Sequence, residues 1–230
     1  QSIRVGPRRR LSIMTASDAD PPPKDAPRPN PFSTRFIQPG AVAYLFEPES
    51  SADTLVERLH EQQWWGEIIG PHGSGKSTLL AELQPELQAA GRHVSTFVCR
   101  EGQRRLPIPA DELRSWNAAT QLIVDGYEQL GWFARWRLQR NCRRRGAGLL
   151  ITAHRPMGLP TLLITRPTLE STRAVVQEIL AAFERQFPTD ERVTIPNDLL
   201  DRLYRQHRGN VREVLFGLYD WYESNRRAKA

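Results

Sequence analysis

One glycine-rich segment constrains the fold of this chain more than any other part of the sequence. It reads Gly70-Pro71-His72-Gly73-Ser74-Gly75-Lys76-Ser77. The string fits the pattern G-x-x-x-x-G-K-[ST], an apolar run precedes it and a helical pattern follows it. Glycines let backbone N–H groups turn inward around phosphate oxygens, and the following helix adds its positive N-terminal end. The segment therefore predicts a phosphate-binding loop (P-loop) between a strand and a helix; a merely glycine-rich turn is the alternative.

Two side chains at the end of this loop carry the expected chemistry. Lys76 should reach the β and γ phosphates of a nucleoside triphosphate, and the Ser77 hydroxyl should ligate magnesium. The remaining contacts are assigned to Gly70, Pro71, His72, Gly73, Ser74, Gly75 and Thr78. No N-K-x-D string of the kind that reads a guanine base is present, which favours ATP. The sequence thus predicts ATP and Mg²⁺ as the bound species.

Strand and helix patterns alternate along the middle of the chain. Strands are expected at 64–69, 93–98, 122–124, 149–152 and 161–165, and helices at about 76–89, 111–116 and 131–145. Such alternation indicates an α/β fold with a parallel sheet and helices on both faces. After Pro167 apolar residues recur only at helical spacing. We therefore expect a P-loop NTPase core over residues 32–168 and a small all-helical unit over residues 169–230.

The first 31 residues differ in composition from the rest of the chain. They contain Arg8-Arg9-Arg10 and a series of prolines from Pro21 to Pro31, with almost no periodic apolar residues. A segment of this kind buries too little apolar surface to offset the entropy of ordering, so we expect it to be disordered. Because the sequence begins with glutamine, Met14 is a candidate initiator.

Composition restricts the class of protein. The two cysteines, Cys99 and Cys142, lie far apart without CxxC spacing, which argues against a disulfide framework or a zinc site. No apolar stretch reaches the roughly 20 residues that cross a bilayer. We therefore expect a cytoplasmic protein with no membrane partner. The net charge of +6 would suit an acidic partner, but a basic tail also produces it.

A second acidic position completes the expected metal site. The apolar run Leu122-Ile123-Val124 ends in Asp125, and a P-loop usually works with a strand whose terminal carboxylate holds magnesium. Asp125 lies one helix-strand-helix unit beyond the P-loop, which is the spacing expected between a P-loop and the strand that carries the magnesium-binding acid. Alternatively, Asp125 only opens a turn at Gly126. We assign the magnesium site to Ser77 and Asp125.

Together these features resemble the AAA+ superfamily of additional-strand P-loop ATPases. The resemblance runs from about Gly66 to Trp221, with five candidate strands in order and a helical region after them. It implies a nucleotide bound between the α/β core and a helical lid, with Phe36 and Ile37 placed to cover the adenine. It also implies frequent assembly into rings or filaments, hence a homo-oligomer, and an unidentified protein partner.

The position of the catalytic acid departs from that family. There, the residue after the magnesium-binding Asp is usually a Glu that polarises the attacking water, whereas this chain has Gly126. The nearest acid, Glu128, could reach the γ phosphate if the loop turns back at the glycine. Alternatively, Glu128 only opens the next helix, where an acid favours the helix dipole.

The resemblance also implies residues that sense the γ phosphate. Thr152, at the end of the fourth strand, is the expected first sensor, and His154 could contact phosphate or orient water. Arg155 could act as an arginine finger toward a neighbouring subunit. Arg212 corresponds to the second sensor, with planar donors suited to phosphate oxygens. The alternatives are an ordinary loop histidine and a solvated arginine in the first turn of a helix capped by Asn210.

The expected helix at 131–145 is strongly basic. Its arginines are Arg135, Arg137, Arg140, Arg143, Arg144 and Arg145. Such a helix could grip DNA phosphates or supply an arginine to the next subunit's nucleotide, although most charge runs are solvated faces. Trp132, Phe133 and Trp136 are interleaved with the arginines, and we expect these aromatics on the buried side of the helix.

Two functions fit these observations. The first is an ATP-binding and ATP-hydrolysing AAA+-like module that couples nucleotide state to conformational change of a partner. The second is a nucleotide-gated protein- or DNA-binding switch with little or no hydrolysis, because Gly126 replaces the usual acid. The role of Glu128 separates the two. A small-molecule kinase is a third class, which the helical tail and the paired sensor candidates fit less well.

Overall fold

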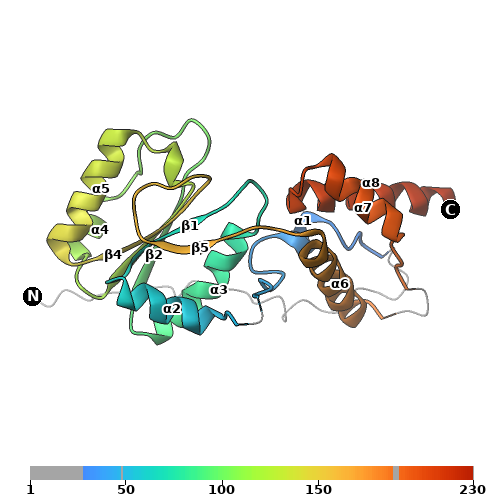
Figure 1. Ribbon diagram of the computed structural model, residues 1–230, viewed down its shortest axis with the longest axis horizontal. Coiled ribbons are helices and arrows are strands. Elements are labelled where there is room, and N and C mark those ends of the chain that lie inside the picture. Colours follow the sequence, from blue (N-terminus) through green and yellow to red (C-terminus); the bar gives the residue numbers. More distant parts are fainter. Residues whose placement is uncertain (1–27, 48, 189–191, 230) are drawn as a thin grey trace, which may run out of the picture.

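A five-stranded parallel sheet forms the centre of the α/β core, which is the left-hand part of the molecule in Figure 1. The computed structural model describes residues 28–47, 49–188 and 192–229. The strands are β1 (Trp65–Ile69), β2 (His93–Val98), β3 (Thr120–Asp125), β4 (Gly148–Ala153) and β5 (Thr161–Ile164). Their order is β2-β3-β4-β1-β5, and every pair of neighbours runs parallel. The expected α/β fold is confirmed.

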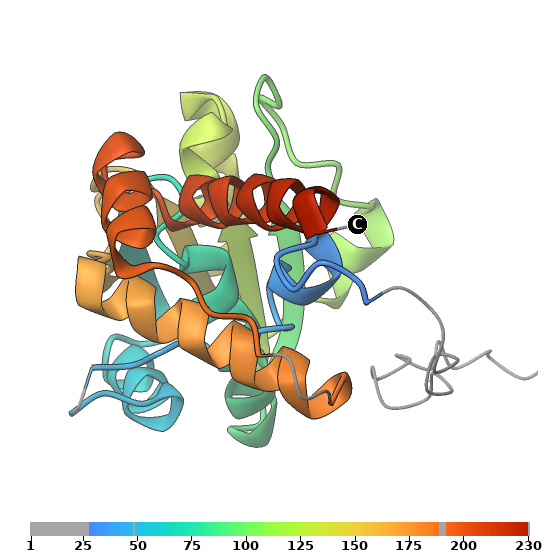
Figure 2. The same cartoon turned by 90° about the vertical axis from the view of Figure 1, so that its right-hand side faces the viewer.

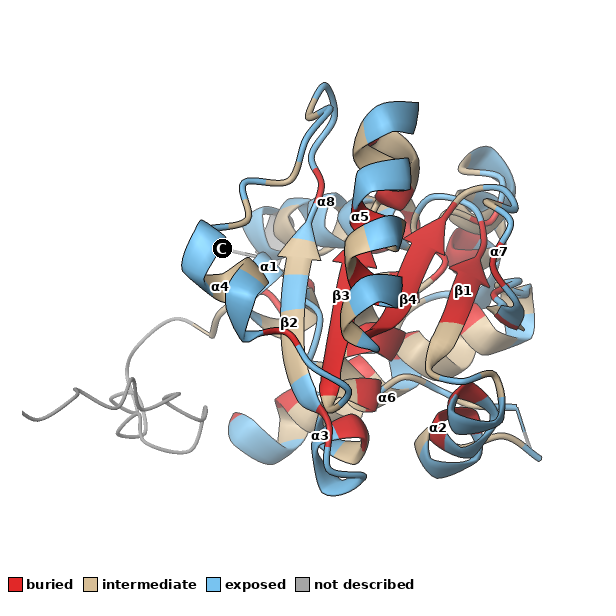
Figure 3. Cartoon of the chain, turned by 90° about the vertical axis from the view of Figure 1, so that its left-hand side faces the viewer, coloured by how far each residue is buried: buried red, intermediate tan, exposed pale blue. Residues whose placement is uncertain are grey.

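Helices cover both faces of this sheet. The helices of the core are α2 (Ala52–Glu61), α3 (Lys76–Ala89), α4 (Ala110–Ser115) and α5 (Trp132–Arg145). Successive strand side chains point to opposite faces, so Ile123 and Leu150 pack with leucines of α2 and α3. Their neighbours Leu122 and Leu149 pack with α5 on the other face. The central strands β3 and β4 are consequently buried on both sides (Figure 3).

The strand order brings three loops together at one edge of the sheet. β4 pairs with β1, placing Ile69 opposite Ala153, and with β3, placing Val124 opposite Ile151. The carboxyl ends of neighbouring parallel strands meet at the same edge, where α/β proteins bind their ligands. The loops after β1, β3 and β4 therefore leave the sheet side by side.

The remaining helices form a separate layer beyond that edge (Figures 1 and 2). They are α1 (Thr34–Ile37), α6 (Leu169–Gln186), α7 (Asn197–Gln206) and α8 (Val211–Lys229). Their shared apolar cluster includes Val176, Ile179, Leu200, Val214 and Leu218. The expected helical region after the core is confirmed. Among the helices of the described residues, none has the length and apolar character needed to cross a bilayer.

The described chain begins against this helical layer. Asn30 is buried and its Nδ2 donates to the backbone oxygen of Tyr219 and to Oε1 of Glu223, both at 3.0 Å. Phe32 is fully buried in the same apolar cluster, and Ile37 packs against it. The segment from residue 28 to 37 thus joins the helical layer, which differs from the expected start of the core at residue 32. Residues 1–27, expected to be disordered, lie outside the described residues.

The aromatic side chains of α5 lie on its outer face, so their expected burial is wrong. The exposed fractions are 75% for Trp132, 52% for Phe133 and 49% for Trp136. Leu138 and Cys142 are the buried residues of this helix, with Ala134 partly buried against the same cluster. Residues four apart share one face of a helix, so these three smaller side chains already fill the face toward the sheet.

Candidate functional site

The glycine-rich segment forms the turn between β1 and α3 that the sequence predicts. Gly73 and Gly75 have φ values of +66° and +86°, in the left-handed region that side chains other than glycine rarely adopt. A Cβ at Gly70 would lie 1.9 Å from Oγ1 of Thr165, so close packing against the end of β5 also requires glycine there. The first N–H groups of a helix have no helical partner, so those of α3 are available to an anion.

Lys76 is held on neutral acceptors within this turn. Its Nζ donates to the backbone oxygens of Gly70 and Pro71, at 2.8 Å and 2.7 Å, and only 8% of the residue is exposed. Burial lowers the pKa of the ammonium, while the carboxylates of Asp125 and Glu128 act in the opposite direction. No carboxylate is described within hydrogen-bond distance of Nζ. An anion that reached this ammonium would therefore relieve an uncompensated buried charge.

Ser77, Asp125 and Thr152 form one hydrogen-bonded group. The Ser77 hydroxyl donates to Oδ2 of Asp125 at 2.6 Å, and the Thr152 hydroxyl donates to Oδ1 of the same carboxylate. The Gly126 N–H in turn donates to the Thr152 hydroxyl at 2.9 Å. The hydroxyl and carboxylate assigned to magnesium thus lie in contact, and oxygen ligands of this kind suit Mg²⁺. Thr152 is fully buried and its hydroxyl holds the carboxylate in place.

Glu128 reaches this site through a turn at the preceding glycine. Gly126 has φ +77° and opens the short helix η1 (Tyr127–Gln129). Oε1 of Glu128 lies 3.1 Å from Nε2 of His154, and Oε2 is buried without a described hydrogen-bond partner. The condition set by the sequence, that the chain turns back at the glycine, is therefore met.

His154 lies between this carboxylate and the P-loop. Its Nδ1 is 3.0 Å from the Gly70 oxygen and 3.4 Å from Nζ of Lys76. Its ring centroid is 3.6 Å from that of His72, whose pKa is lowered first by burial and then by His154 and Lys76. Nε2 of His154 faces the Glu128 carboxylate, whereas its Nδ1 faces both a carbonyl oxygen and the Lys76 ammonium, so the ring links the carboxylate to the P-loop.

The beginning of α8 rests directly on the P-loop. A Cβ at Gly73 would lie 1.8 Å from Oδ1 of Asn210 and 3.1 Å from the backbone nitrogen of Arg212. Oδ1 of Asn210 also accepts from the Glu213 N–H at 3.4 Å, which caps the helix. Sequence reasoning identified Arg212 but missed Asn210 as a P-loop contact, because only the folded arrangement of the helical layer brings the two loops together.

A cavity of about 760 Å³ lies between the core and the helical layer, and residues of both line it. Its polar end contains the P-loop with Asp125, Glu128, His154 and Arg212. Its apolar end is lined by Ile37, Val42, Tyr44, Val175, Ile179 and Leu215, among others. Such a division suits a ligand with an anionic part and a flat apolar part. Of the two residues expected at adenine, Ile37 lines the cavity, whereas Phe36 packs edge-on against Phe183 and Phe187.

The two cysteines are predicted to be inert toward thiol reagents. Burial raises the pKa of Cys99 to about 11 and that of Cys142 to about 12. Since the thiolate is the reactive form, only about one Cys99 in a thousand is ionised at pH 8. We expect negligible reaction with a chromogenic disulfide at pH 8 and release of two thiols per chain after denaturation. Rapid reaction of the folded protein would contradict this burial.

Comparisons with known proteins show likeness of fold. No protein-family model matches the chain, and no curated protein sequence does. Among solved structures, a chain from the structure of Drosophila ORC bound to DNA superposes with a TM-score of 0.59. The match covers 99% of this chain and 67% of that chain, at 15% sequence identity. A parallel α/β core followed by a helical region is thus a fold shared with a known structure.

Proposed function

We propose that this chain is an AAA+-like module that binds ATP with Mg²⁺ and hydrolyses it between its α/β core and its helical lid, residues 169–229. The observation that carries the proposal is the convergence of Lys76, Asp125 and Arg212 on one cavity. The position of β4 between β1 and β3 supports it, since this is the additional strand expected of that class. The likeness to the ORC chain is consistent with the same assignment.

The residues at the polar end fit a triphosphate. The N-terminal N–H groups of α3 and the ammonium of Lys76 would bind the phosphate oxygens, the lysine exchanging its two carbonyl acceptors for the β and γ phosphates. Ser77 and Asp125 would hold Mg²⁺, which supplies charge neutralisation on the phosphates when bound. The apolar end, with Ile37 and Tyr44, would receive the base.

Glu128 is the proposed general base for hydrolysis. Its Oε1 is held by His154, while Oε2 is buried without a described partner and would accept a proton from a water bound in the cavity beside the nucleotide. His154 would act as a positioning residue for this carboxylate. This arrangement replaces the acid that usually follows the magnesium-binding Asp, because the turn at Gly126 brings Glu128 back to the cavity.

The lid supplies the proposed coupling between nucleotide and partner. Asn210 touches Gly73, and Arg212 lies at the same cavity as Lys76, so a bound γ phosphate would change the contacts of α8. Arg155 is exposed just beyond β4 and is available to a neighbouring subunit. We accordingly propose a homo-oligomer that acts on a protein partner, with Arg155 as the residue offered across the subunit interface.

One observation favours the second candidate, a nucleotide-gated switch with little hydrolysis. The contact with His154 engages the carboxylate of Glu128, which is the proposed base. Because Oε2 of the same carboxylate is buried, the base is withheld from water if this arrangement persists with ATP bound. ATP would then control the position of the lid without being consumed.

The proposal is tested by phosphate release from Mg²⁺·ATP. We expect turnover at least about tenfold above that of Lys76→Ala, and loss of turnover in excess EDTA, because the metal is required for charge neutralisation. ATP binding without turnover would favour the switch. Absence of both binding and turnover would overturn the nucleotide site itself.

A further inference from the structure

The outer face of α5 carries three large aromatic side chains that the fold does not use. Trp132, Phe133 and Trp136 are about half or more exposed, although α5 is packed on the sheet through its other face. The rings form a connected group, with 6.0 Å between the centroids of Trp132 and Phe133 and 5.7 Å between those of Phe133 and Trp136. The second pair is stacked, at an interplanar angle of 28°. Exposed aromatics gathered in this way usually mark a binding surface.

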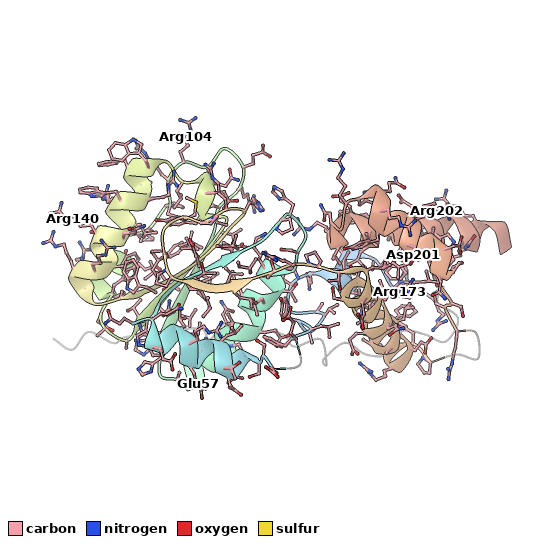
Figure 4. All side chains as sticks on the ribbon, in the orientation of Figure 1. Glu57, Arg104, Arg140, Arg173, Asp201 and Arg202 are labelled. Atoms are coloured by element: carbon pink, nitrogen blue, oxygen red, sulfur yellow. The ribbon has the colours of Figure 1, made fainter. Side chains whose placement is uncertain are left out.

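The same face is basic and without acids. α5 contains six arginines and no Asp or Glu in its sequence WFARWRLQRNCRRR. Within the described residues, no ion pair involves any of these arginines. The guanidinium of Arg140 lies 5.3 Å from the ring centroid of Trp136, and Arg140 points away from the core (Figure 4). The charge of this surface is therefore available to an anionic partner.

A neighbouring loop extends this surface beyond the start of the helix. The backbone oxygen of Arg104 accepts from the Gly131 N–H at 3.1 Å, which fixes the loop at the N-terminal end of α5. The side chains of Arg104 and Arg105 are exposed. Basic groups thus lie on both sides of the aromatic group, at the loop and along the C-terminal half of the helix.

We propose that this surface, named here the α5 face (Trp132, Phe133, Trp136, Arg137, Arg140 and Arg144), binds single-stranded nucleic acid. Bases would stack on the exposed rings, and the arginines would contact the phosphates. This combination of stacking platforms and basic side chains is the general means of binding unpaired strands. The proposal does not depend on the nucleotide site.

The arrangement along the helix favours an unpaired strand over two other anionic partners. In a duplex the base faces are covered by their neighbours, so the exposed rings would find no stacking partner. A membrane-surface helix separates an apolar face from a basic one. On α5 the aromatic and basic residues are mixed on one side, because Trp132, Trp136 and Arg140 are spaced four residues apart. The helix therefore has no uncharged apolar face that could enter a bilayer.

The aromatic part of the proposal is tested with a labelled oligothymidylate of about 20 nucleotides, by fluorescence anisotropy on the full chain. We expect saturable binding that weakens at least about fivefold in Trp132→Ala/Trp136→Ala, the lower end of the effect of removing one stacked base. Tyr219→Ala, which removes an exposed aromatic from α8, is the matched control and should bind as the unchanged protein does. Thermal unfolding of each variant shows that the fold is intact.

The charged part has its own variants. In a plot of log affinity against log salt concentration, Arg137→Ala/Arg144→Ala should reduce the magnitude of the slope by about 1.4. Each phosphate contact to a single strand contributes about 0.7 to that slope. Arg205→Ala/Arg227→Ala removes two exposed arginines from α7 and α8 and should leave the slope unchanged.

Unchanged oligothymidylate affinity in both α5 variants would overturn the proposal. Equal or tighter binding of a duplex of the same length, or binding of anionic lipid vesicles without binding of oligothymidylate, would also overturn it.

Discussion

Glu128→Gln lowers the rate of ATP hydrolysis by about 100- to 10,000-fold, the range expected for loss of a general base, and leaves ATP bound. The amide keeps the size of the side chain and a hydrogen bond to His154, but it cannot take a proton from water. Binding survives because the described polar contact of Glu128 is with His154 and not with Lys76 or Ser77. Steady-state phosphate release, with ATP affinity measured separately, shows both effects.

Glu101→Gln is the matched control for this change. Glu101 lines the same cavity, but the structure gives it no hydrogen bond or ion pair with the catalytic group. It should hydrolyse ATP at close to the unchanged rate. Full activity of Glu128→Gln would show that Glu128 serves only to open η1, and the protein would then need another source for the base.

Asp125→Asn is expected to lower turnover by at least about 100-fold, since a metal ion contributes several kcal/mol to stabilising developing charge. The Asp125 carboxylate accepts from both Ser77 and Thr152, so it is fixed beside the hydroxyl that would share the metal. The neutral amide removes one negative charge from the proposed magnesium site. ATP affinity should therefore rise with Mg²⁺ in the unchanged protein and respond far less in the variant.

Asp111→Asn is the comparison for this charge change, because Asp111 is an exposed acid in the first turn of α4. Its ATP affinity should depend on Mg²⁺ as that of the unchanged protein does. The assignment of Asp125 to the metal would be contradicted if Asp125→Asn kept the full dependence of both affinity and turnover on Mg²⁺.

The elements of the core could be predicted because their determinants are local in sequence. The helix at 76–89 and the strand at 93–98 have the predicted bounds, since Gly75 and Gly91 punctuate the chain between periodic segments. The strands at 120–125 and 148–153 are one or two residues longer at each end than predicted. The placement of Ser77 and Asp125 at the same edge of the sheet also follows from sequence, because the carboxyl ends of all strands in a parallel sheet lie at one edge.

The features that the sequence did not predict depend on which segments, distant in sequence, pack against each other in the folded protein. The amphipathic pattern of α5 predicts Trp132 and Trp136 on its buried side, yet Leu138 and Cys142 already fill that face. Phe32 precedes the core in sequence but packs in the helical layer. Helical periodicity indicates that a face is apolar; it does not indicate which distant segment will cover it.

The measurement that tests the central claim most directly is calorimetric titration of the full chain with Mg²⁺·ATP, beside Lys76→Ala. The Lys76 ammonium is buried on neutral carbonyl oxygens, and phosphate would replace them with charge-assisted hydrogen bonds. We expect one saturable site per chain, with affinity at least about tenfold weaker in the variant, as loss of a hydrogen bond to a charged group implies. Absence of saturable binding, or equal affinity in the two proteins, would contradict the assignment of this cavity to a nucleoside triphosphate.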